Sequence, residues 1–177
     1  MITVSGIKTT ARLTYKTELE AKVYETLAKL GIPFRRVDTG EAITMEDCQA
    51  NDQAIGLPIV KSLFLCDRQQ EHFYLYILPG DQRFDSKAFS QGLGISRVSF
   101  APKELFETML QAKIGAATLL SALVDPQNKI RIVIDSSVAM KKEIGISDGT
   151  DTCFMILKTQ DVLKTLLPSA NHPATIL

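Results

Sequence analysis

The chain has 177 residues, of which 45% are hydrophobic and 23% charged, and this composition is typical of one globular domain with a substantial core. Twenty basic residues balance twenty acidic ones, which argues against general binding to DNA or RNA, because such binding needs a large cationic surface. No apolar run approaches the roughly 20 residues that cross a bilayer, and the first residues lack the pattern of a secretory signal. We therefore expect a cytoplasmic protein without a membrane span.

Cysteine and histidine are too few and too scattered to predict a metal site. Cys48, Cys66 and Cys153 lie far apart in the sequence, no Cys-x-x-Cys occurs, and His72 and His172 are the only histidines. We expect reduced, mostly buried thiols and no zinc site. The sequence also lacks the short signatures of the serine-hydrolase elbow, the P-loop, the dinucleotide-binding loop and the zinc-dependent proteases.

The first predicted helix has clear signals at both ends. Thr17 and Glu20 have the spacing of a capping box, apolar residues then recur at helical spacing, and Gly31 ends the helix. Further along, the patterns predict a strand at residues 34–38 and a second helix that Thr44 caps, with Asp47 as a weaker capping-box partner.

The most informative stretch is residues 57–67, LPIVKSLFLCD. Pro58 cannot donate a ladder hydrogen bond, so we expect a strand to begin just after it. Alternation places Lys61 on one face with Leu63 and Leu65, and both faces are mostly apolar, which predicts a strand covered on both sides. Such a lysine must extend its ammonium to water, pair with a carboxylate or face a polar cavity. Residue chemistry alone favours the first explanation over a ligand-facing lysine.

The remaining elements are hairpin strands and short helices. Residues 72–78 form the second strand of a hairpin, and a strand at 129–135 follows a type I turn and packs mainly on one face. The other predicted elements are a helix capped by Asp85 or Ser86, a strand at 97–100, a helix with Pro102 as its first residue, a strand at 152–157, and a helix that Thr159 caps and Pro168 ends.

Hairpins outnumber strict strand–helix–strand units in this series. This favours a mixed, largely antiparallel α/β domain with helices packed around its sheet. Residues 1–16 show no clear hydrophobic period. We therefore expect an N-terminal arm at 1–16, a single domain at 17–168 and an irregular tail at 169–177.

Two segments are candidates for a binding site. Residues 115–119, GAATL, would let a ligand approach backbone N–H groups closely, as an oxyanion site requires. The alternative, which the residues alone favour, is a glycine that ends a helix before a tightly packed strand. Residues 149–152 either bring Asp151 and Thr152 to a pocket or only close a turn, and the residues alone favour the turn.

The order of these segments resembles one family throughout. It is similar to the YbaK/prolyl-tRNA deacylase family of editing domains, and most of all to the free-standing prolyl-tRNA-deacylase-like branch. The resemblance extends over about residues 17–168, and its most specific part runs from KSLFLCD to SRVSFA. The segments that carry it are VDTGEAITMEDCQ, LPIVKSLFLCD, YLYILPGD, LGISRVSFAP, KIGAATLL, the DPQN turn and KIRIVID.

This resemblance implies a mixed α/β fold, with a largely antiparallel sheet or partial barrel surrounded by helices. It also implies hydrolysis in trans of the ester that joins a wrong amino acid to tRNA, in particular tRNA charged by prolyl-tRNA synthetase. The family is expected to use water oriented by backbone amides and by the ribose hydroxyl of the substrate, with no metal, no cofactor and no covalent nucleophile. The implied partners are the 3′ end of aminoacyl-tRNA and prolyl-tRNA synthetase.

The resemblance assigns roles to eight residues. Lys61 falls on the family's signature lysine and would hold the terminal adenosine or its phosphate. Gly115 begins the family's Gly-x-x-x-Pro loop, whose backbone amides position the aminoacyl carbonyl. Lys61 and Gly115 are therefore the expected catalytic residues, and the expected substrate-binding residues are Ala116, Ala117, Thr118, Leu119, Asp151 and Thr152.

The sequence departs from the family pattern at three places. Leu119 replaces the loop proline, Ser147 and Asp148 replace a His-Pro pair, and Asp151 stands where asparagine is common. An anion at Asp151 would either attract the α-amino group of the substrate or disturb a neutral hydrogen-bond pattern. These departures keep a second function open, in which a module of the same fold binds aminoacyl-tRNA or another small ligand without hydrolysing it.

Overall fold

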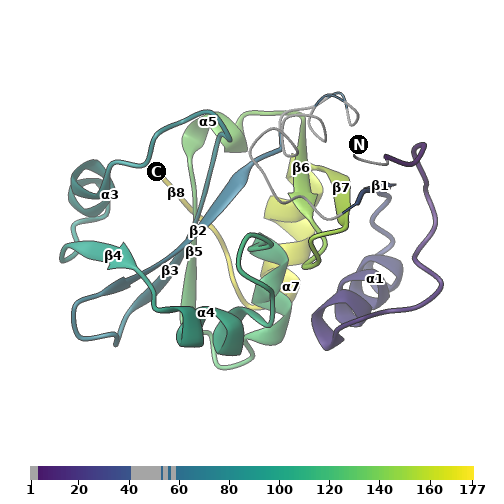
Figure 1. Cartoon of the computed structure of the whole chain (residues 1–177). Helices are drawn as coiled ribbons and strands as arrows, with labels where there is room; N and C mark the ends of the chain where they lie inside the picture. The colour runs from purple at the N-terminus through teal and green to yellow at the C-terminus, as the bar shows by residue number, and fades with distance from the viewer. Residues whose placement is uncertain (1–3, 41–52, 54–55, 57–58) are drawn as a thin grey trace.

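The computed structural model describes residues 4–40, 53, 56 and 59–177. It contains two β-sheets with helices packed around them (Figure 1). The larger sheet has five strands in the order β4-β2-β3-β5-β8, and the smaller has three in the order β1-β7-β6. Among the described residues, four of the six strand pairs are antiparallel, which confirms the mixed, largely antiparallel α/β fold.

The five-stranded sheet is built on the predicted hairpin. β2 (Lys61–Asp67) pairs antiparallel with β3 (Phe73–Leu78) on one side and with β4 (Val98–Phe100) on the other. β5 (Ile130–Ile134) lies parallel to β3, and β8 (Thr175–Ile176) lies parallel to β5. The tail predicted to be irregular therefore contributes an edge strand to this sheet.

Both faces of this sheet are covered, as the alternation along β2 predicts. Phe64 belongs to the main hydrophobic core, together with residues of α1 (Glu18–Leu30) and the 3₁₀ helix η1 (Leu119–Val124). Leu65 belongs to a second cluster on the opposite face, together with Phe89 of α3 (Ser86–Leu93). β5 contributes Ile130, Ile132 and Ile134 to the first cluster and only Val133 to the second, so it packs mainly on one face, as predicted.

The three-stranded sheet packs its inner face on the same main core. β1 (Arg35–Asp38) and β6 (Glu143–Ser147) flank β7 (Cys153–Lys158), and both pair with it antiparallel. Met155 and Leu157 of β7 are fully buried in the core. The two sheets meet where the N–H of Val60 donates to the carbonyl oxygen of Gly145 at 3.0 Å, so the start of β2 lies beside β6 (Figure 1).

The first helix begins and ends at the predicted residues. The hydroxyl of Thr17 accepts a hydrogen bond from the N–H of Glu20 at 3.1 Å, and Gly31 ends α1 in the left-handed conformation. The reciprocal bond differs from a standard capping box, because the Glu20 carboxylate accepts from the N–H of Lys16, one residue before the cap. Asp85 caps α3 with its side chain, as predicted.

Two helix predictions need correction. Pro102 is the N-cap of α4 (Lys103–Leu110) and not its first helical residue. Thr159 is the first residue of the last helical segment and not its cap, because β7 runs through Lys158 directly into it. Pro168 lies inside the final turn of that segment and does not end it. The segment consists of α6 (Thr159–Asp161), the π-helical η2 (Val162–Leu166) and α7 (Leu167–Ser169).

A short helix that was not predicted, α5 (Ser136–Ala139), follows β5. The predicted helix at Thr44 and Asp47, the thiol of Cys48 and Pro58 itself lie outside the described residues, and the strand expected just after Pro58 begins at Lys61. Within the described residues, no helix has the length and apolar character needed to cross a membrane.

Candidate functional site

The turn between β6 and β7 is held by its own side chains. Ser147 Oγ donates to the carbonyl oxygen of Thr150 at 2.7 Å and accepts from the N–H of Gly149 at 3.0 Å. Asp148 Oδ1 accepts from the N–H and from the hydroxyl of Thr150, at 3.0 and 2.7 Å. These side chains are buried, so their hydrogen bonds fix one conformation of the turn. They thereby also fix the positions of Asp151 and Thr152, the last two residues of the turn.

Asp148 links the turn to α1. Its side chain is fully buried, and Oδ2 accepts a hydrogen bond from the hydroxyl of Tyr24 at 2.8 Å. Burial and the neighbouring Asp148 carboxylate raise the pKa of Tyr24 far above its ordinary value, and they raise the pKa of Cys153 in the same way. The thiol of Cys153 therefore stays protonated and buried, which does not suit a nucleophile.

A close approach at Gly149 adds a second link to α1. The φ angle of Gly149 is +98°, in the region that favours glycine. A Cβ atom at this position would lie 2.6 Å from Cδ2 of Leu19, which is fully buried. Both the backbone conformation and the lack of space therefore require glycine at 149.

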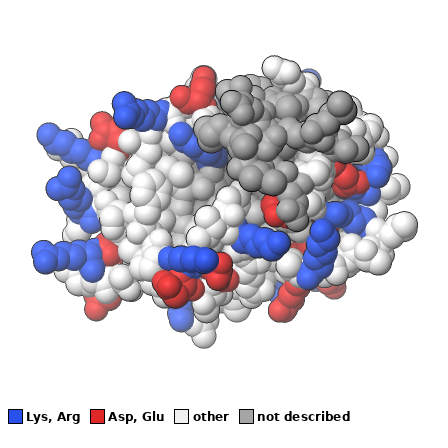
Figure 2. Space-filling model, in the orientation of Figure 1, with Lys and Arg blue, Asp and Glu red and all other residues white. Residues whose placement is uncertain are grey.

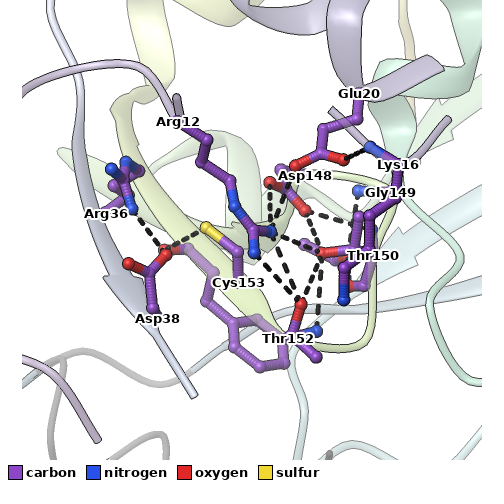
Figure 3. A network of polar contacts seen from close by, with 12 residues as sticks. Arg12, Lys16, Glu20, Arg36, Asp38, Asp148, Gly149, Thr150, Thr152 and Cys153 are labelled. Carbon is purple, nitrogen blue, oxygen red and sulfur yellow. Dashed lines mark hydrogen bonds and ion pairs between the residues drawn. The ribbon is translucent and has the colours of Figure 1, made fainter. Parts of the chain in front are cut away.

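The N-terminal arm reaches the same turn through Arg12 (Figure 3). Arg12 Nη1 lies 3.1 Å from Oε1 of Glu20 and 3.7 Å from Oδ2 of Asp148. The same nitrogen donates to the hydroxyls of Thr150 and Thr152, at 3.3 and 3.4 Å. Arg12 is absent from the sequence predictions, because an arm without hydrophobic periodicity gives no signal of a long-range contact.

The small-residue loop follows a helix that ends well before Gly115. α4 ends at Leu110, and Gln111 takes the left-handed conformation there, whereas Gly115 has a φ angle of +91° in a separate turn. Thr118 then caps η1, since its hydroxyl accepts from the N–H of Leu120 at 3.3 Å. The explanation of Gly115 as a helix cap before a strand is therefore wrong.

Two backbone N–H groups of this loop have no acceptor within the described residues. The N–H of Ala116 donates to the carbonyl oxygen of Lys113 at 2.9 Å. The N–H groups of Gly115 and Ala117 donate no hydrogen bond to any described residue, and Gly115 is exposed while Ala117 is half-buried. Unused N–H groups in a turn are the donors with which proteins bind oxyanions and carboxylates.

An ion pair places the loop beside the turn. Lys113 Nζ lies 3.9 Å from Oδ2 of Asp151, with the lysine side chain 76% exposed and the aspartate 30% exposed. Thr118 and Leu119 are fully buried, and Leu119 packs in the main core. Their side chains therefore support the loop from within the core and do not face open space.

Lys61 makes no side-chain hydrogen bond or ion pair with the described residues of the loop or the turn. It is the half-buried first residue of β2, and alternation places it on the face of Leu63 and Leu65, which α3 covers. In the part of the chain that the structure describes, no hydrogen bond or ion pair holds its ammonium. Its backbone is nevertheless one residue from the contact between Val60 and Gly145, so it lies next to the strand that leads into the turn.

Neither the surface charge on the face shown in Figure 2 nor the two cavities beside Phe34 and Phe73 point to the predicted site residues. On the face shown in Figure 2, Lys and Arg side chains are interspersed with Asp and Glu and do not merge into one basic surface. A cavity of about 480 Å³ lies beside Phe34 and Ile156, and one of about 540 Å³ beside Phe73 and Lys129. None of the predicted site residues lines either cavity. Among the described residues, no three His, Cys, Asp or Glu side chains gather around a possible metal position.

Known proteins resemble this chain over most of its length. Residues 39–165 match the family model described as the aminoacyl-tRNA editing domain. The chain is 24% identical over 156 residues to the prolyl-tRNA editing protein ProX of Acetoanaerobium sticklandii, which covers 87% of this chain and 95% of the relative. It is 26% identical over 161 residues to prolyl-tRNA synthetase associated domain-containing protein 1 of Mus musculus, with 89% and 95% covered. A crystal structure described as that of a candidate trans-editing enzyme for prolyl-tRNA synthetase matches this chain with a TM-score of 0.66 at 18% identity. The match covers 92% of this chain and 98% of that chain, so the two share the same fold.

Proposed function

The chain belongs to the family of aminoacyl-tRNA editing domains, and on this premise we propose that it hydrolyses mischarged aminoacyl-tRNA in trans. The family and the editing-domain fold that the sequence predicts are thereby confirmed. The name of the relative ProX supports tRNA-Pro as the substrate, and the name of the mouse relative supports prolyl-tRNA synthetase as the enzyme that produces it. A synthetase pocket discriminates between two amino acids that differ by one methylene by only about 1–3 kcal/mol. A separate editing step is needed to remove the wrong amino acids that this pocket accepts.

The reaction exchanges one carbon–oxygen bond for another. The oxygen of a water molecule adds to the carbonyl carbon of the aminoacyl ester, and negative charge gathers on the carbonyl oxygen. The bond from this carbon to the ribose oxygen then breaks. One proton of the water ends on the ribose oxygen and the other is released with the amino-acid carboxylate. The adjacent hydroxyl of the terminal ribose is suited to relay the first proton, which would restrict the substrate to RNA.

The unused N–H groups of Gly115 and Ala117 are the observation that carries this proposal. They would donate to the carbonyl oxygen as its negative charge develops, while the bond from Ala116 to Lys113 keeps the loop in place. Removing one such donor from an oxyanion site costs roughly 10²–10³-fold in kcat. A backbone site of this kind needs no catalytic histidine and no covalent nucleophile.

The amino-acid end of the substrate would lie against Asp151 and Thr152. The Asp151 carboxylate is partly exposed, and its only charged partner among the described residues is the exposed ammonium of Lys113 at 3.9 Å. Such an exposed pair is weak, so the α-ammonium of an aminoacyl group can replace it. Thr118 and Leu119 are fully buried, so they would support the loop from the core side and would not contact the substrate with their side chains.

Lys61 would hold the terminal adenosine or its phosphate. The observation that supports this role is that Lys61 is half-buried and that its ammonium has no hydrogen bond or ion pair among the described residues. A half-buried lysine without a carboxylate is available to an anionic ligand.

The alternative function is a module that binds aminoacyl-tRNA or a small ligand without hydrolysing it. The leucine at position 119, the Ser147–Asp148 pair and the anion at Asp151 are the features that favour it. Assays with alanyl-, cysteinyl- and prolyl-tRNA-Pro separate the two functions. The deacylase releases free amino acid with multiple turnovers from at least one of the mischarged substrates, whereas the module binds tRNA and releases none.

Lys61→Ala tests the assigned site in the same assay. We expect a loss of about 100-fold in kcat/KM with Tm nearly unchanged, because the removed ammonium makes no contact within the described fold. Lys129→Ala is the matched control. This lysine is exposed, directly precedes β5, and lines the cavity of about 540 Å³, which none of the predicted site residues lines. A Lys61→Ala protein that is unfolded, or fully active, would contradict the assignment.

A further inference from the structure

We propose that Arg12 is a positioning residue of the candidate site, and that the N-terminal arm (residues 4–16) thereby fixes the turn that presents Asp151 and Thr152. The inference rests on the proposed deacylase function, because it gives the arm a part in that reaction. The residues that the family resemblance assigns to the site all lie outside this arm.

The arm is anchored on β1 before it reaches Arg12. The backbones of Lys8 and Arg36 exchange two hydrogen bonds, of 2.8 and 2.7 Å. The guanidinium of Arg36 then donates to the carbonyl oxygen of Thr10 at 2.6 Å. Arg12 follows two residues later, so its side chain extends toward the turn from a backbone that is already held.

Arg12 is the cation between two fully buried carboxylates. The side chains of Glu20 and Asp148 have no exposed surface, and that of Arg12 is 18% exposed. Burial by itself would lower the pKa of Arg12, but Glu20 and Asp148 outweigh it and raise the pKa, so the guanidinium stays charged. Without this cation the two carboxylates would be buried and uncompensated, which is strongly unfavourable. Asp148 would then move or take up a proton, and the turn is folded around Asp148.

Arg12 also determines the direction in which two hydroxyl groups donate. A guanidinium carries only donors, so Oγ1 of Thr150 and Oγ1 of Thr152 accept from it. The single proton of the Thr150 hydroxyl goes to Asp148 at 2.7 Å. The two threonine oxygens are 3.4 Å apart, and since the Thr150 proton is already used, Thr152 is the donor of any hydrogen bond between them. The Thr152 proton is therefore directed away from Arg12, so Arg12 fixes the orientation of the Thr152 hydroxyl in the turn.

These contacts predict an effect on the chemical step more than on tRNA binding. Arg12 holds the groups around the aminoacyl carbon, whereas Lys61, assigned to the nucleotide, lies on a separate strand. We expect Arg12→Ala to lower kcat for the mischarged tRNA-Pro that the wild-type protein deacylates fastest by about 10-fold or more, with KM changed by less than about threefold.

Three variants give this experiment its controls. Lys8→Ala removes another cation of the same arm, paired with Asp38 at 2.7 Å, and should keep kcat within about twofold of wild type because it does not contact the turn. Thr152→Val removes the hydroxyl that Arg12 orients, and adding it to Arg12→Ala should cost little more than either change alone. Arg12→Lys keeps the charge without the forked donors, so it should recover the thermal stability but not the full kcat.

The outcomes separate this inference from the function on which it rests. A wild-type protein that releases no amino acid overturns both. An active wild type with an Arg12→Ala variant of equal kcat overturns the positioning role alone. So does a loss that only follows the folded fraction measured by circular dichroism, or a multiplicative effect of Arg12→Ala and Thr152→Val. If Arg12→Ala does not fold, Arg12→Lys decides, because a folded variant with wild-type kcat also overturns the inference.

Discussion

The turn at 147–152 and the loop at 113–118 lie side by side and are built in opposite ways. In the turn, the side chains of Ser147, Asp148 and Thr150 are buried and bonded to one another and to the backbone. In the loop, the N–H groups of Gly115 and Ala117 have no acceptor among the described residues. The turn is rigid because its hydrogen bonds are internal, whereas the loop keeps two unused donors, with which it would bind a ligand under the proposed function. A site for a short-lived anion needs both properties, since free donors stabilise charge only when their surroundings hold them in place.

The largest expected effect is a loss of stability when a side chain is added at Gly149 in the rigid turn. Gly149→Ala should lower the free energy of unfolding by about 2–4 kcal/mol, because the new Cβ meets Leu19 and the φ angle of +98° strains it. Urea unfolding followed by circular dichroism measures this loss. Gly6→Ala is the matched control, since no heavy atom lies within 4 Å of its added Cβ. A Gly149→Ala protein as stable as wild type would show that the turn is not rigid.

The next effect is a loss of stability at alkaline pH. The folded pKa of Cys153 is raised, so above about pH 8.5 the unfolded chain loses this thiol proton while the folded chain keeps it. Stability should therefore fall by about 1.4 kcal/mol per pH unit on account of this thiol alone. Urea titrations of the wild type and of Cys153→Ala between pH 8 and 10 measure the difference. Parallel curves for the two proteins would contradict the prediction.

A smaller loss of stability, accompanied by a loss of activity, is expected for Gly115→Ala in the loop. Gly115→Ala should cost about 1–2 kcal/mol of stability, because its φ of +91° is strained for alanine although no atom crowds the new Cβ. The same change at Gly94, with a φ of +64° and equally open space, should cost a similar amount. Only Gly115→Ala should also lower the kcat of deacylation, by about 10-fold, because it displaces a proposed donor. Equal activities in the two variants would remove Gly115 from the site.

The smallest effect concerns the ion pair between the two regions. Lys113→Ala should change stability by less than about 0.5 kcal/mol, since the lysine is 76% exposed. It should also lower KM for the mischarged substrate by about twofold, because Asp151 loses its competing cation. Steady-state deacylation kinetics measure this change, with Lys129→Ala as the control. A raised KM would indicate that Lys113 itself contacts the tRNA.

Local signals predicted the elements that depend on local contacts. The caps at Thr17 and Asp85 were predictable because their hydrogen bonds reach only two or three residues along the chain. β6 was not predicted, because its sequence EIGIS is short, contains a glycine and follows two lysines. Its strand conformation depends on β7 and on the contact of Gly145 with Val60, which lies far away in the sequence.

The site was predictable to a different extent. The resemblance to an editing family assigned Lys61, the loop from Gly115 and Asp151 to one site, and these assignments stay predictions. The resemblance does not indicate which side chains are buried, so it could not show that Leu119 packs in the main core. The pairing of Lys113 with Asp151 and the reach of Arg12 to Thr152 depend on the tertiary fold, and no spacing in the sequence encodes them.

The contact between Arg12 and Thr152 joins residues 140 positions apart, and this separation affects the order in which the protein folds. During synthesis the arm leaves the ribosome before β6 and β7, so it has no turn to contact until they have followed it. Contacts that close so long a stretch of chain form late, because the entropy of closure is lost before the contact contributes any stabilisation. The core can therefore assemble before this contact forms, and under the role proposed for Arg12 the protein would become active only after the arm has docked on the turn.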